Sequence, residues 1–306
     1  MPDGAFGAAG GAKSSSLPDN ALCQFRMTLT TLTPITTSDV TAATTLYITP
    51  YRGNYIGLLT GASRWRRIPS AEFSIPVPAT TVTMYDLFVR LQSGYPYPQA
   101  IAWTNDTTRA QAISLRDGIY VLTDDPRMRY IGSFRTTDSS GQTEDSGDRG
   151  SLVECKRYVW NYYNRVPRRI RIIDATGSWS YSTNTWRSWD NNTANRVSFV
   201  IGVSENPVFL RFDAFVRSTS ATDREHIGID LDGTTANDAQ VYTYTAMQVA
   251  SQVVALQATY DSTVAIGYHF LQLLEIAGAA GTSTWFGDAV GANNQTQAGA
   301  IGWVEG

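Results

Sequence analysis

The sequence predicts an all-β protein built from two domains. Short runs rich in β-branched and aromatic residues, such as Thr44–Thr49 (TTLYIT), are typical of strands. Turn signals such as Pro50–Asn54 follow these runs at short intervals. Charged residues make up only 17% of the 306 residues, below the usual quarter, and hydroxyl and amide side chains replace them. Such a surface is typical of all-β extracellular or virion proteins, and the length suffices for two domains.

Residues 1–21 are rich in Gly, Ala and Ser and cannot build a core of their own. Two interpretations are open, a disordered tail or an extended arm that becomes ordered on a neighbouring subunit. We favour an anchoring arm, in which Phe6 is the large apolar residue that could hold the protein on the virion.

Residues 22–136 are expected to form the first β-domain. Alternating apolar residues and turn signals predict the strands and hairpins in this order: Phe25–Leu32, Thr44–Thr49, Tyr55–Leu59, Trp65–Ile68, Phe73–Val77, Thr81–Leu91, Gln99–Trp103, Ile119–Leu122 and Arg129–Thr136. The one helix predicted here covers Thr107–Leu115, because Asp106 or Thr107 could cap it and alanines and an isoleucine supply an apolar side.

Residues 137–172 are expected to be a linker and an interface shoulder. Thr137–Gly150 is polar and Gly-rich and has no large apolar residue, which indicates a domain boundary. Its acidic residues Glu144, Asp145 and Asp148 do not match the spacing of a calcium-binding EF-hand loop, so no metal is expected.

The densest aromatic and basic run of the chain, Trp160–Arg171 (WNYYNRVPRRIR), closes this shoulder. Such a mixture could bind nucleic acid by base stacking and phosphate contacts, or it could pack arginines on aromatic rings at an interface. The formal net charge of −3 favours the interface and argues against nucleic acid. The expected residues of an oligomer or domain interface are Tyr158, Trp160, Tyr162, Tyr163, Arg165, Arg168 and Arg169.

Residues 173–306 are expected to form the second β-domain, with clear strands at 196–203, 208–218 and 225–230 and a last strand at 298–304. Val264–Glu275 is the most apolar strand and should be central to the core. Residues 241–260 read as two strands, although residues 246–256 could also be helical.

Three tryptophans lie in a Ser/Thr/Asn-rich stretch near the start of this domain, at Trp179, Trp186 and Trp189. Flat aromatic rings among amides are what sugar-binding surfaces use, since rings stack on pyranose faces and amides bond hydroxyls. Tryptophans also pack between strands, so a glycan contact and a core role are both open.

Sequence patterns of common enzymes, such as GxSxG, GxxxxGK[ST], HExxH and CxxC, do not occur. Two carboxylate pairs, Asp230 with Asp232 and Asp213 with Glu225, could in principle serve glycoside hydrolysis. The repeats of a long parallel β-helix, the usual fold of tailspike glycosidases, are missing. We therefore expect no enzymatic activity and no cofactor.

Cys23 and Cys155 lie far apart in the sequence and lack metal-ligand spacing. They could form a disulfide, but two buried free thiols are favoured. No apolar run reaches 18 residues, so membrane insertion is not expected.

The stretch WNYYNRVPRRIRIID (160–174), with the upstream TPITTSDVTAATTLYITPYRGNYIGLL (33–59) and AWTNDTTRAQAISLRDGIYV (102–121), resembles a group of tailed-bacteriophage structural proteins. The resemblance covers roughly residues 27–200. The C-terminal part looks like the jelly-roll head of a trimeric fibre that ends in a glycine-rich strand.

This resemblance implies a component of the phage particle. We expect a homotrimer at the particle surface, in contact with other virion proteins. The expected function is that of a tail fibre or receptor-binding protein that contacts the host surface. A head fibre or capsid decoration (cement) protein, whose role is particle assembly and stability, is the alternative.

Overall fold

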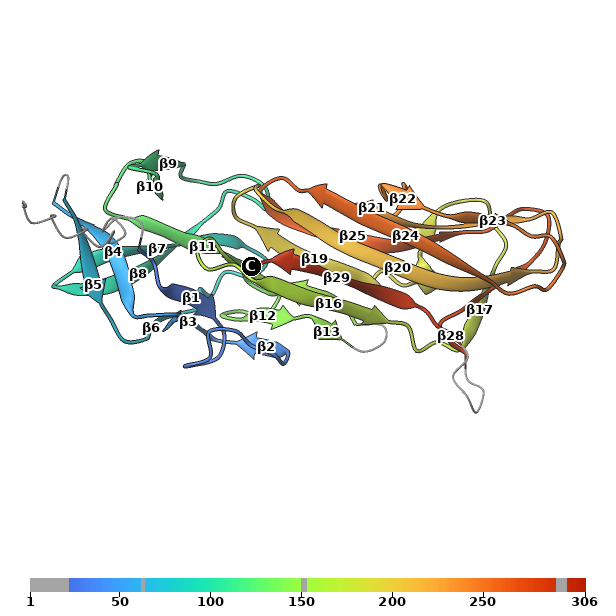
Figure 1. Ribbon diagram of the computed structural model, residues 1–306, viewed down its shortest axis with the longest axis horizontal. Coiled ribbons are helices and arrows are strands. Elements are labelled where there is room, and N and C mark those ends of the chain that lie inside the picture. The colour runs from blue at the N-terminus through green and yellow to red at the C-terminus, as the bar shows by residue number, and fades with distance from the viewer. Residues whose placement is uncertain (1–21, 62–63, 150–152, 290–295) are drawn as a thin grey trace, which may run out of the picture.

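The molecule is an elongated all-β protein with an N-terminal body at one end and a larger β-sandwich head at the other (Figure 1). The computed structural model describes residues 22–61, 64–149, 153–289 and 296–306. Their regular structure is β-strand throughout, apart from one short 3₁₀ turn at Trp189–Asn191. The predicted all-β fold class is therefore confirmed.

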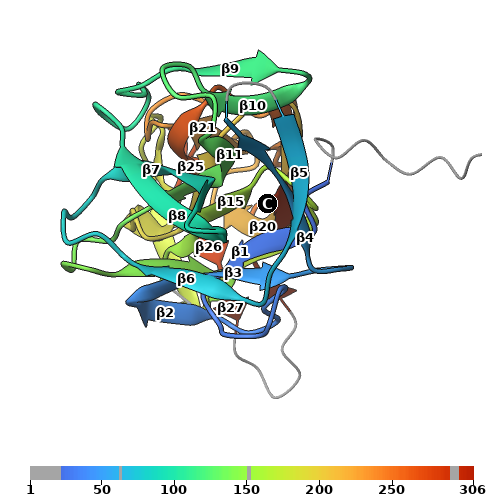
Figure 2. The same cartoon turned by 90° about the vertical axis from the view of Figure 1, so that its left-hand side faces the viewer.

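The N-terminal body combines two small sheets and a hairpin that lie around a common core (Figure 2). One sheet has the order β1-β3-β6 and the other the order β8-β7-β11-β10-β9, with β15 paired to β11. The strands are β1 (Phe25–Thr28), β3 (Thr45–Pro50), the hairpin β4 (Tyr55–Thr60) and β5 (Arg64–Pro69), β6 (Phe73–Pro76), β7 (Met84–Gln92), β8 (Tyr95–Ala102), β9 (Ile113–Arg116), β10 (Ile119–Leu122), β11 (Arg129–Arg135) and β15 (Val159–Asn161).

The head is a jelly roll. Its eight main strands are β16 (Pro167–Ile173), β19 (Arg196–Ile201), β20 (Pro207–Ser218), β21 (Arg224–Leu231), β23 (Tyr244–Ala246), β24 (Val254–Thr263), β25 (Gly267–Ile276) and β29 (Gly299–Glu305). They form two antiparallel four-stranded layers, β16-β29-β20-β24 and β19-β25-β21-β23. This order is that of two Greek keys folded together, which is the jelly-roll arrangement. We call the two layers the β20 sheet and the β25 sheet.

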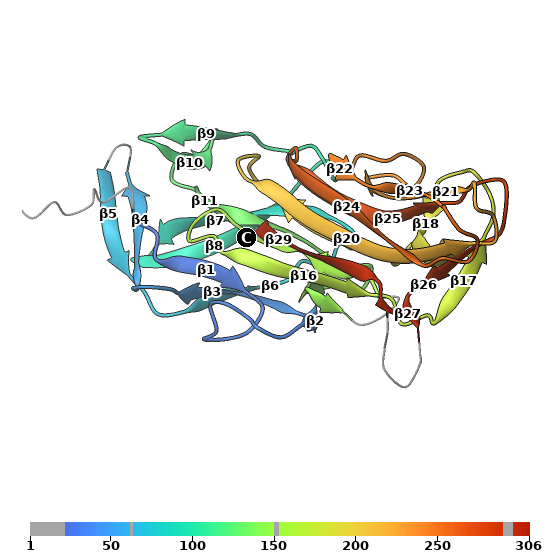
Figure 3. The ribbon, with the colours of Figure 1, turned by 45° about the vertical axis from the view of Figure 1, so that its right-hand side comes forward.

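Shorter strands extend both layers of the head (Figure 3). They are β2 (Val40–Ala43), β12 (Thr143–Ser146), β14 (Cys155–Arg157) and β18 (Arg187–Ser188) on the β25 sheet, and β13 (Asp148–Arg149), β17 (Ser178–Tyr181), β22 (Val241–Tyr242) and β26 (Ser283–Phe286) on the β20 sheet. A separate two-stranded ribbon pairs β27 (Asp288–Ala289) with β28 (Thr296–Gln297).

Strands alternate between buried and accessible side chains where one face of a sheet meets the core. In β20 every second residue from Val208 to Ser218 is buried, and the residues between them are accessible. As predicted, the apolar strand β25 lies centrally, between β19 and β21. Its buried residues Leu271 and Leu273 point into the sandwich.

The two parts of the molecule exchange strands, and this corrects the expected linker at 137–172. β12, β14 and β16 from that segment belong to the head, whereas β15 pairs with β11 of the N-terminal body. In return, β2 from the first half of the chain pairs with β12 in the head. The polar stretch expected to be a domain boundary contains a buried strand at Thr143–Ser146, whose side chains are hydrogen-bonded inside the protein.

The helix predicted at Thr107–Leu115 is wrong. Asn105 accepts a hydrogen bond from the backbone of Thr107, which makes a turn instead. Ile113–Arg116 then forms β9 and pairs with β10. The tertiary pairing outweighs a helical tendency that two adjacent threonines already weaken. The helical alternative for residues 246–256 is wrong as well, because β23 ends at Ala246 and β24 begins at Val254.

Candidate functional site

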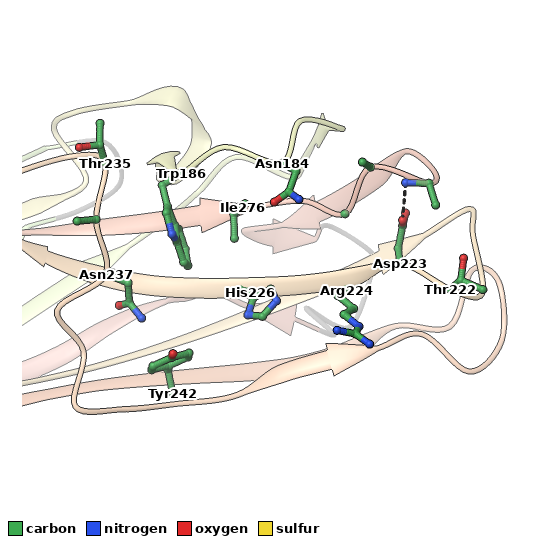
Figure 4. Close-up of a pocket in the computed structure, with 14 residues that line it drawn as sticks. Asn184, Trp186, Thr222, Asp223, Arg224, His226, Thr235, Asn237, Tyr242 and Ile276 are labelled. Atoms are coloured by element: carbon green, nitrogen blue, oxygen red, sulfur yellow. Dashed lines mark hydrogen bonds between the residues drawn. The ribbon is translucent and has the colours of Figure 1, made fainter.

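An open groove of about 1010 Å³ lies on the outer face of the β25 sheet (Figure 4). We call it the distal groove. Its lining residues come from the segment before β18, the start of β21 and the two residues before it, the loop between β21 and β22, β22 itself, and the end of β25 with the loop that follows: Asn184, Trp186, Thr222, Asp223, Arg224, His226, Thr235, Ala236, Asn237, Tyr242, Ile276, Gly278, Ala279 and Ala280.

The floor of the groove follows from the two-residue alternation of paired strands. His226 is the register partner of Ile276, and both line the groove. Their neighbours Ile227 and Glu275 are paired in the same way but are fully buried on the other face. One strand therefore supplies both core packing and the outward-facing side chains of the groove.

Aromatic rings line the middle of the groove. The ring centroids of Trp186 and His226 are 6.5 Å apart in an edge-to-face arrangement. Tyr244 stacks on the other side of His226 at 5.2 Å and is 58% exposed. Tyr242, half exposed, lies at the opposite wall (Figure 4). Accessible rings in this arrangement can pack against the apolar face of a ligand ring.

The walls carry amide and hydroxyl groups. The Oδ1 atom of Asn237 accepts hydrogen bonds from the backbone N–H groups of Ile229 and Ala239, at 3.0 and 3.1 Å. This fixes the amide, and its NH₂ group has no hydrogen-bond partner among the described residues. Thr222, Thr235 and the exposed Asn184 add further polar groups (Figure 4).

Charge in the groove is concentrated at one end. Asp223 is buried and accepts hydrogen bonds from the Ser218 hydroxyl and, at 2.8 Å, from the Ala280 backbone N–H. Arg224 is exposed, and its guanidinium has no hydrogen bond or ion pair within the described ranges. Burial, with a smaller contribution from Arg224, lowers the pKa of His226 below its usual value, so the imidazole is neutral at pH 7.

Of the three tryptophans predicted to contact a glycan, the structure places Trp186 in the distal groove and the other two elsewhere. Trp189 is fully buried, with Trp285 and Phe212 edge-on at 5.4 and 4.9 Å, so its role is in the core and the glycan interpretation is wrong for it. Trp179 packs edge-on against Trp189 at 4.6 Å and is half-buried.

A buried carboxylate lies beneath the groove. Glu275 accepts a hydrogen bond from Trp179 Nε1 at 2.9 Å and pairs with Arg187 at 2.6 Å. Desolvation nevertheless dominates and raises the pKa of Glu275 to about 7. Arg187 in turn stacks over the Tyr181 ring at 3.7 Å. These groups hold the segment that carries Trp186.

The carboxylate pairs considered for hydrolysis do not form a site in this structure. Asp230 accepts hydrogen bonds from two backbone N–H groups, and Asp232 pairs with His269 at 2.7 Å. Asp213 lies on β20 and pairs with Arg211, whereas Glu225 lies in the other sheet and bonds Ser283. Each of these carboxylates is occupied by groups of the chain itself.

The aromatic and basic run around Trp160 lies where the N-terminal body meets the head. Trp160 and Tyr158 are buried, and Arg168 is almost completely so. Arg165 stacks over the Trp160 and Tyr162 rings and pairs with Glu205 at 2.6 Å. Tyr163 accepts a hydrogen bond from Arg129 of β11 at 3.2 Å, while Arg169 is exposed on β16.

The acidic stretch before this run pairs with basic residues in the run and just before it. Asp145 forms two buried ion pairs, with Arg157 at 2.8 Å and Arg168 at 2.7 Å. Glu144 pairs with Lys156 at 3.4 Å. Across the described residues no group of three possible metal ligands comes together. The expected anchor Phe6 and the arm 1–21 lie outside the described residues.

Cys23 and Cys155 are buried free thiols, as the sequence favoured. Burial raises the pKa of the Cys155 thiol to about 12, so it stays protonated and unreactive at neutral pH. No helix in the described portion is long and apolar enough to cross a membrane.

Sequence reasoning missed most of the groove, namely Asn184, Arg224, His226, Asn237 and Tyr242. Alternation in residues 224–231 could have placed Arg224 and His226 on the same outward face. Nothing local could have brought Asn237 and Trp186 to that face, because they come from loops on either side of it.

No protein-family model and no curated protein matches this chain. Among solved structures, it is similar to the insecticidal delta-endotoxin Cry8Ea1 from Bacillus thuringiensis, with 9% identity and a TM-score of 0.26 over 92% of this chain and 52% of that one. A tryptic core variant of Cry1Da from the same organism matches with 7% identity and a TM-score of 0.19, over 86% of this chain and 48% of that one. The chain thus spans about half the length of both toxins, and these scores carry no functional argument.

Proposed function

We propose that this chain is a non-catalytic structural protein of a phage particle that contacts a host-surface glycan through the distal groove. The observation that carries the proposal is the lining of that groove. Accessible rings of Trp186, His226 and Tyr242 lie beside the amides of Asn184 and Asn237. Such a surface can stack on sugar rings and bond their hydroxyl groups.

The position of the groove supports a receptor contact. β25 starts against the N-terminal body, where the backbone N–H of Tyr268 donates to the Asp106 carbonyl at 2.8 Å. The same strand ends at Ile276 in the groove. Ten strand residues span roughly 30 Å at about 3.3 Å each, so the groove is at the end of the head far from the N-terminal body.

The state of the nearby carboxylates favours binding over catalysis. Asp223 in the groove and Glu275 beneath it are both held by side chains or backbone groups of the protein. A hydrolase of sugars needs two carboxyl groups facing the substrate, one to protonate and one to attack or activate water.

The proposal includes a homotrimer, with copies in contact through the outer face of the β20 sheet. Phe209 and Trp303 stack there with ring centroids 4.3 Å apart. Trp303 is 42% exposed and Ile301, two residues earlier on β29, is 53% exposed. Neighbouring exposed apolar residues on one face are the usual mark of a surface that is covered in an assembly.

Capsid decoration is the second candidate, and one observation favours it. Strand β8 is the edge of its sheet in the N-terminal body and presents Tyr95 and Tyr97, which are 76% and 44% exposed. Exposed tyrosines at an edge suit attachment to another virion protein. Stoichiometric capsid binding that is lost when residues 1–20 are deleted, without any saccharide binding, would favour this function.

Binding of the purified full chain to immobilised bacterial capsular and cell-wall polysaccharides tests the leading proposal. We expect saturable binding that Trp186→Ala abolishes. Tyr95→Ala, which removes an exposed ring on the N-terminal body, should leave the binding intact. Saccharide binding that is absent, or equal in both variants, contradicts the assignment of the groove.

A further inference from the structure

We infer that the glycan held in the distal groove is anionic, and that the Arg224 guanidinium pairs with its carboxylate or phosphate group. This inference rests on the proposed function, because it names the class of saccharide that the same groove takes. It is carried by the arrangement of Arg224, the aromatic centre and the fixed carboxylate beside them.

Arg224 is the available cation of the groove. Most arginines in this protein are occupied by carboxylates, carbonyls or rings, as are Arg109, Arg157 and Arg187. Arg224 is exposed at the groove end and makes no such contact among the described residues. A planar guanidinium with free donors is the side chain best suited to bind a carboxylate or phosphate in a bidentate manner.

The acidic neighbour does not cancel this role by pairing with Arg224. The carboxylate of Asp223 is buried, and it is directed to the Ser218 hydroxyl and the Ala280 backbone N–H. Gly278 allows this packing, since a Cβ atom there would lie 2.6 Å from Asp223 Oδ1. Asp223 therefore fixes the loop after β25, and its neighbour Arg224 presents the charge to solvent.

The spacing along β21 matches a ring with an acidic substituent. Arg224 and His226 are two residues apart on a strand and share the outward face, so they lie roughly 7 Å apart along it. A sugar ring that packs on the accessible surface of Trp186 beside His226 can therefore direct an acidic group to Arg224 (Figure 4). Asn237 lies on the opposite side of His226 from Arg224, and its NH₂ group can donate to a hydroxyl.

Because His226 is neutral, the recognition of an acidic group is assigned to Arg224. Its pKa is lowered by burial and by Arg224, so the imidazole adds ring surface but no positive charge at pH 7. Removal of the Arg224 charge should then remove the electrostatic part of binding, and the aromatic part should remain.

The test is calorimetric titration of the full chain with three matched oligosaccharides: a uronic-acid oligomer, its carboxyl-reduced neutral form, and a phosphorylated oligomer. Wild type, Arg224→Gln and the control Arg66→Gln, an exposed arginine on β5, are compared. We expect the parent to bind an anionic oligomer about tenfold more tightly than the neutral one. Arg224→Gln should lose that difference and Arg66→Gln should keep it.

The three oligosaccharides and the variants distinguish the possible outcomes. The choice between uronic and phosphorylated oligomers identifies the acidic group, and preference for either one supports the inference. Equal binding of charged and neutral forms, or an unchanged preference in Arg224→Gln, overturns it, while binding that depends on Trp186 still upholds the proposed function. If no oligosaccharide, charged or neutral, binds in a Trp186-dependent manner, both fail.

Discussion

The guanidinium of Arg109 donates a hydrogen bond to the backbone carbonyl of Gly202 at 2.7 Å, across the boundary between the N-terminal body and the head. The same side chain pairs with the buried Asp86 at 2.6 Å and stacks over the Trp103 ring at 4.5 Å. Gly202 lies so close to the junction that a Cβ atom would come 2.2 Å from the Tyr130 hydroxyl. One arginine thus connects the two parts of the molecule.

Arg109→Ala should therefore destabilise the protein by about 3 kcal/mol, because it leaves the Asp86 carboxylate buried without its ion-pair partner. Chemical denaturation followed by tryptophan fluorescence measures the loss. The control is Arg127→Ala, which removes an exposed pair with Asp125 and should leave the denaturation midpoint unchanged. Equal midpoints for both variants would show that Arg109 does not hold the junction.

Arg168→Ala should also destabilise the protein, by about 3 kcal/mol, since it breaks a buried ion pair with Asp145. Tyr162→Ala should cost less, because that ring is half-buried although it packs against Trp160. The control is Arg211→Ala, which removes a surface ion pair with Asp213 and should change the free energy of unfolding by less than about 1 kcal/mol. If Arg168→Ala and Tyr162→Ala assemble and melt like the parent, the interface interpretation of this run is wrong.

Glu275 should make the stability of the head depend on pH. Its pKa is about 7 in the folded protein against 4.5 for a solvent-exposed glutamate, because it is desolvated. Between these two pH values the folded state then binds more protons than the unfolded state. The stabilisation that this gives is therefore complete below pH 4.5 and is lost as the pH rises through 7. The difference is on the order of 3 kcal/mol.

Glu275→Gln removes the titration. The free energy of unfolding of the parent should fall by about that amount between pH 5 and pH 8, whereas that of the variant should not show this fall. Urea unfolding at the two pH values measures it, and parallel changes in parent and variant would contradict the burial argument.

Trp303→Ser tests the proposed contact between copies. Removal of the half-exposed ring that stacks on Phe209 should shift the mass measured by light scattering from trimer toward monomer. Tyr95→Ser, at an even more exposed ring on β8, should leave the mass unchanged. A monomeric parent, or a trimer in both variants, would contradict a contact between copies through the outer face of the β20 sheet.

Local patterns were sufficient for the hairpins and the long strands. The hairpin of β4 and β5 and the pairing of β10 with β11 match the predicted runs, since alternation and turn residues act within a few positions. The same local reasoning failed for Thr107–Leu115. The backbone there follows a turn at Asn105 and the insertion of Arg109 into the junction, neither of which is visible in a window of the sequence.

Local sequence likewise predicted only part of the candidate site. Trp186 could be selected from its polar, aromatic surroundings, but so were Trp179 and Trp189, which pack into the sandwich. The three indoles have similar local sequence contexts, and their burial depends on which strands pack opposite them. The groove needs contributions from separate loops, and their encounter is a property of the jelly-roll connections.

The amino-acid sequence alone determined the all-β class, the central position of the apolar strand β25 and the burial of two free thiols, because side-chain type and alternation act locally. Tertiary structure alone decided that residues 137–172 are shared strands, that Asp145 binds two arginines, and that Arg224 faces a groove with Trp186. Those outcomes depend on contacts between residues distant in the chain, whose register is set by the packing of both sheets.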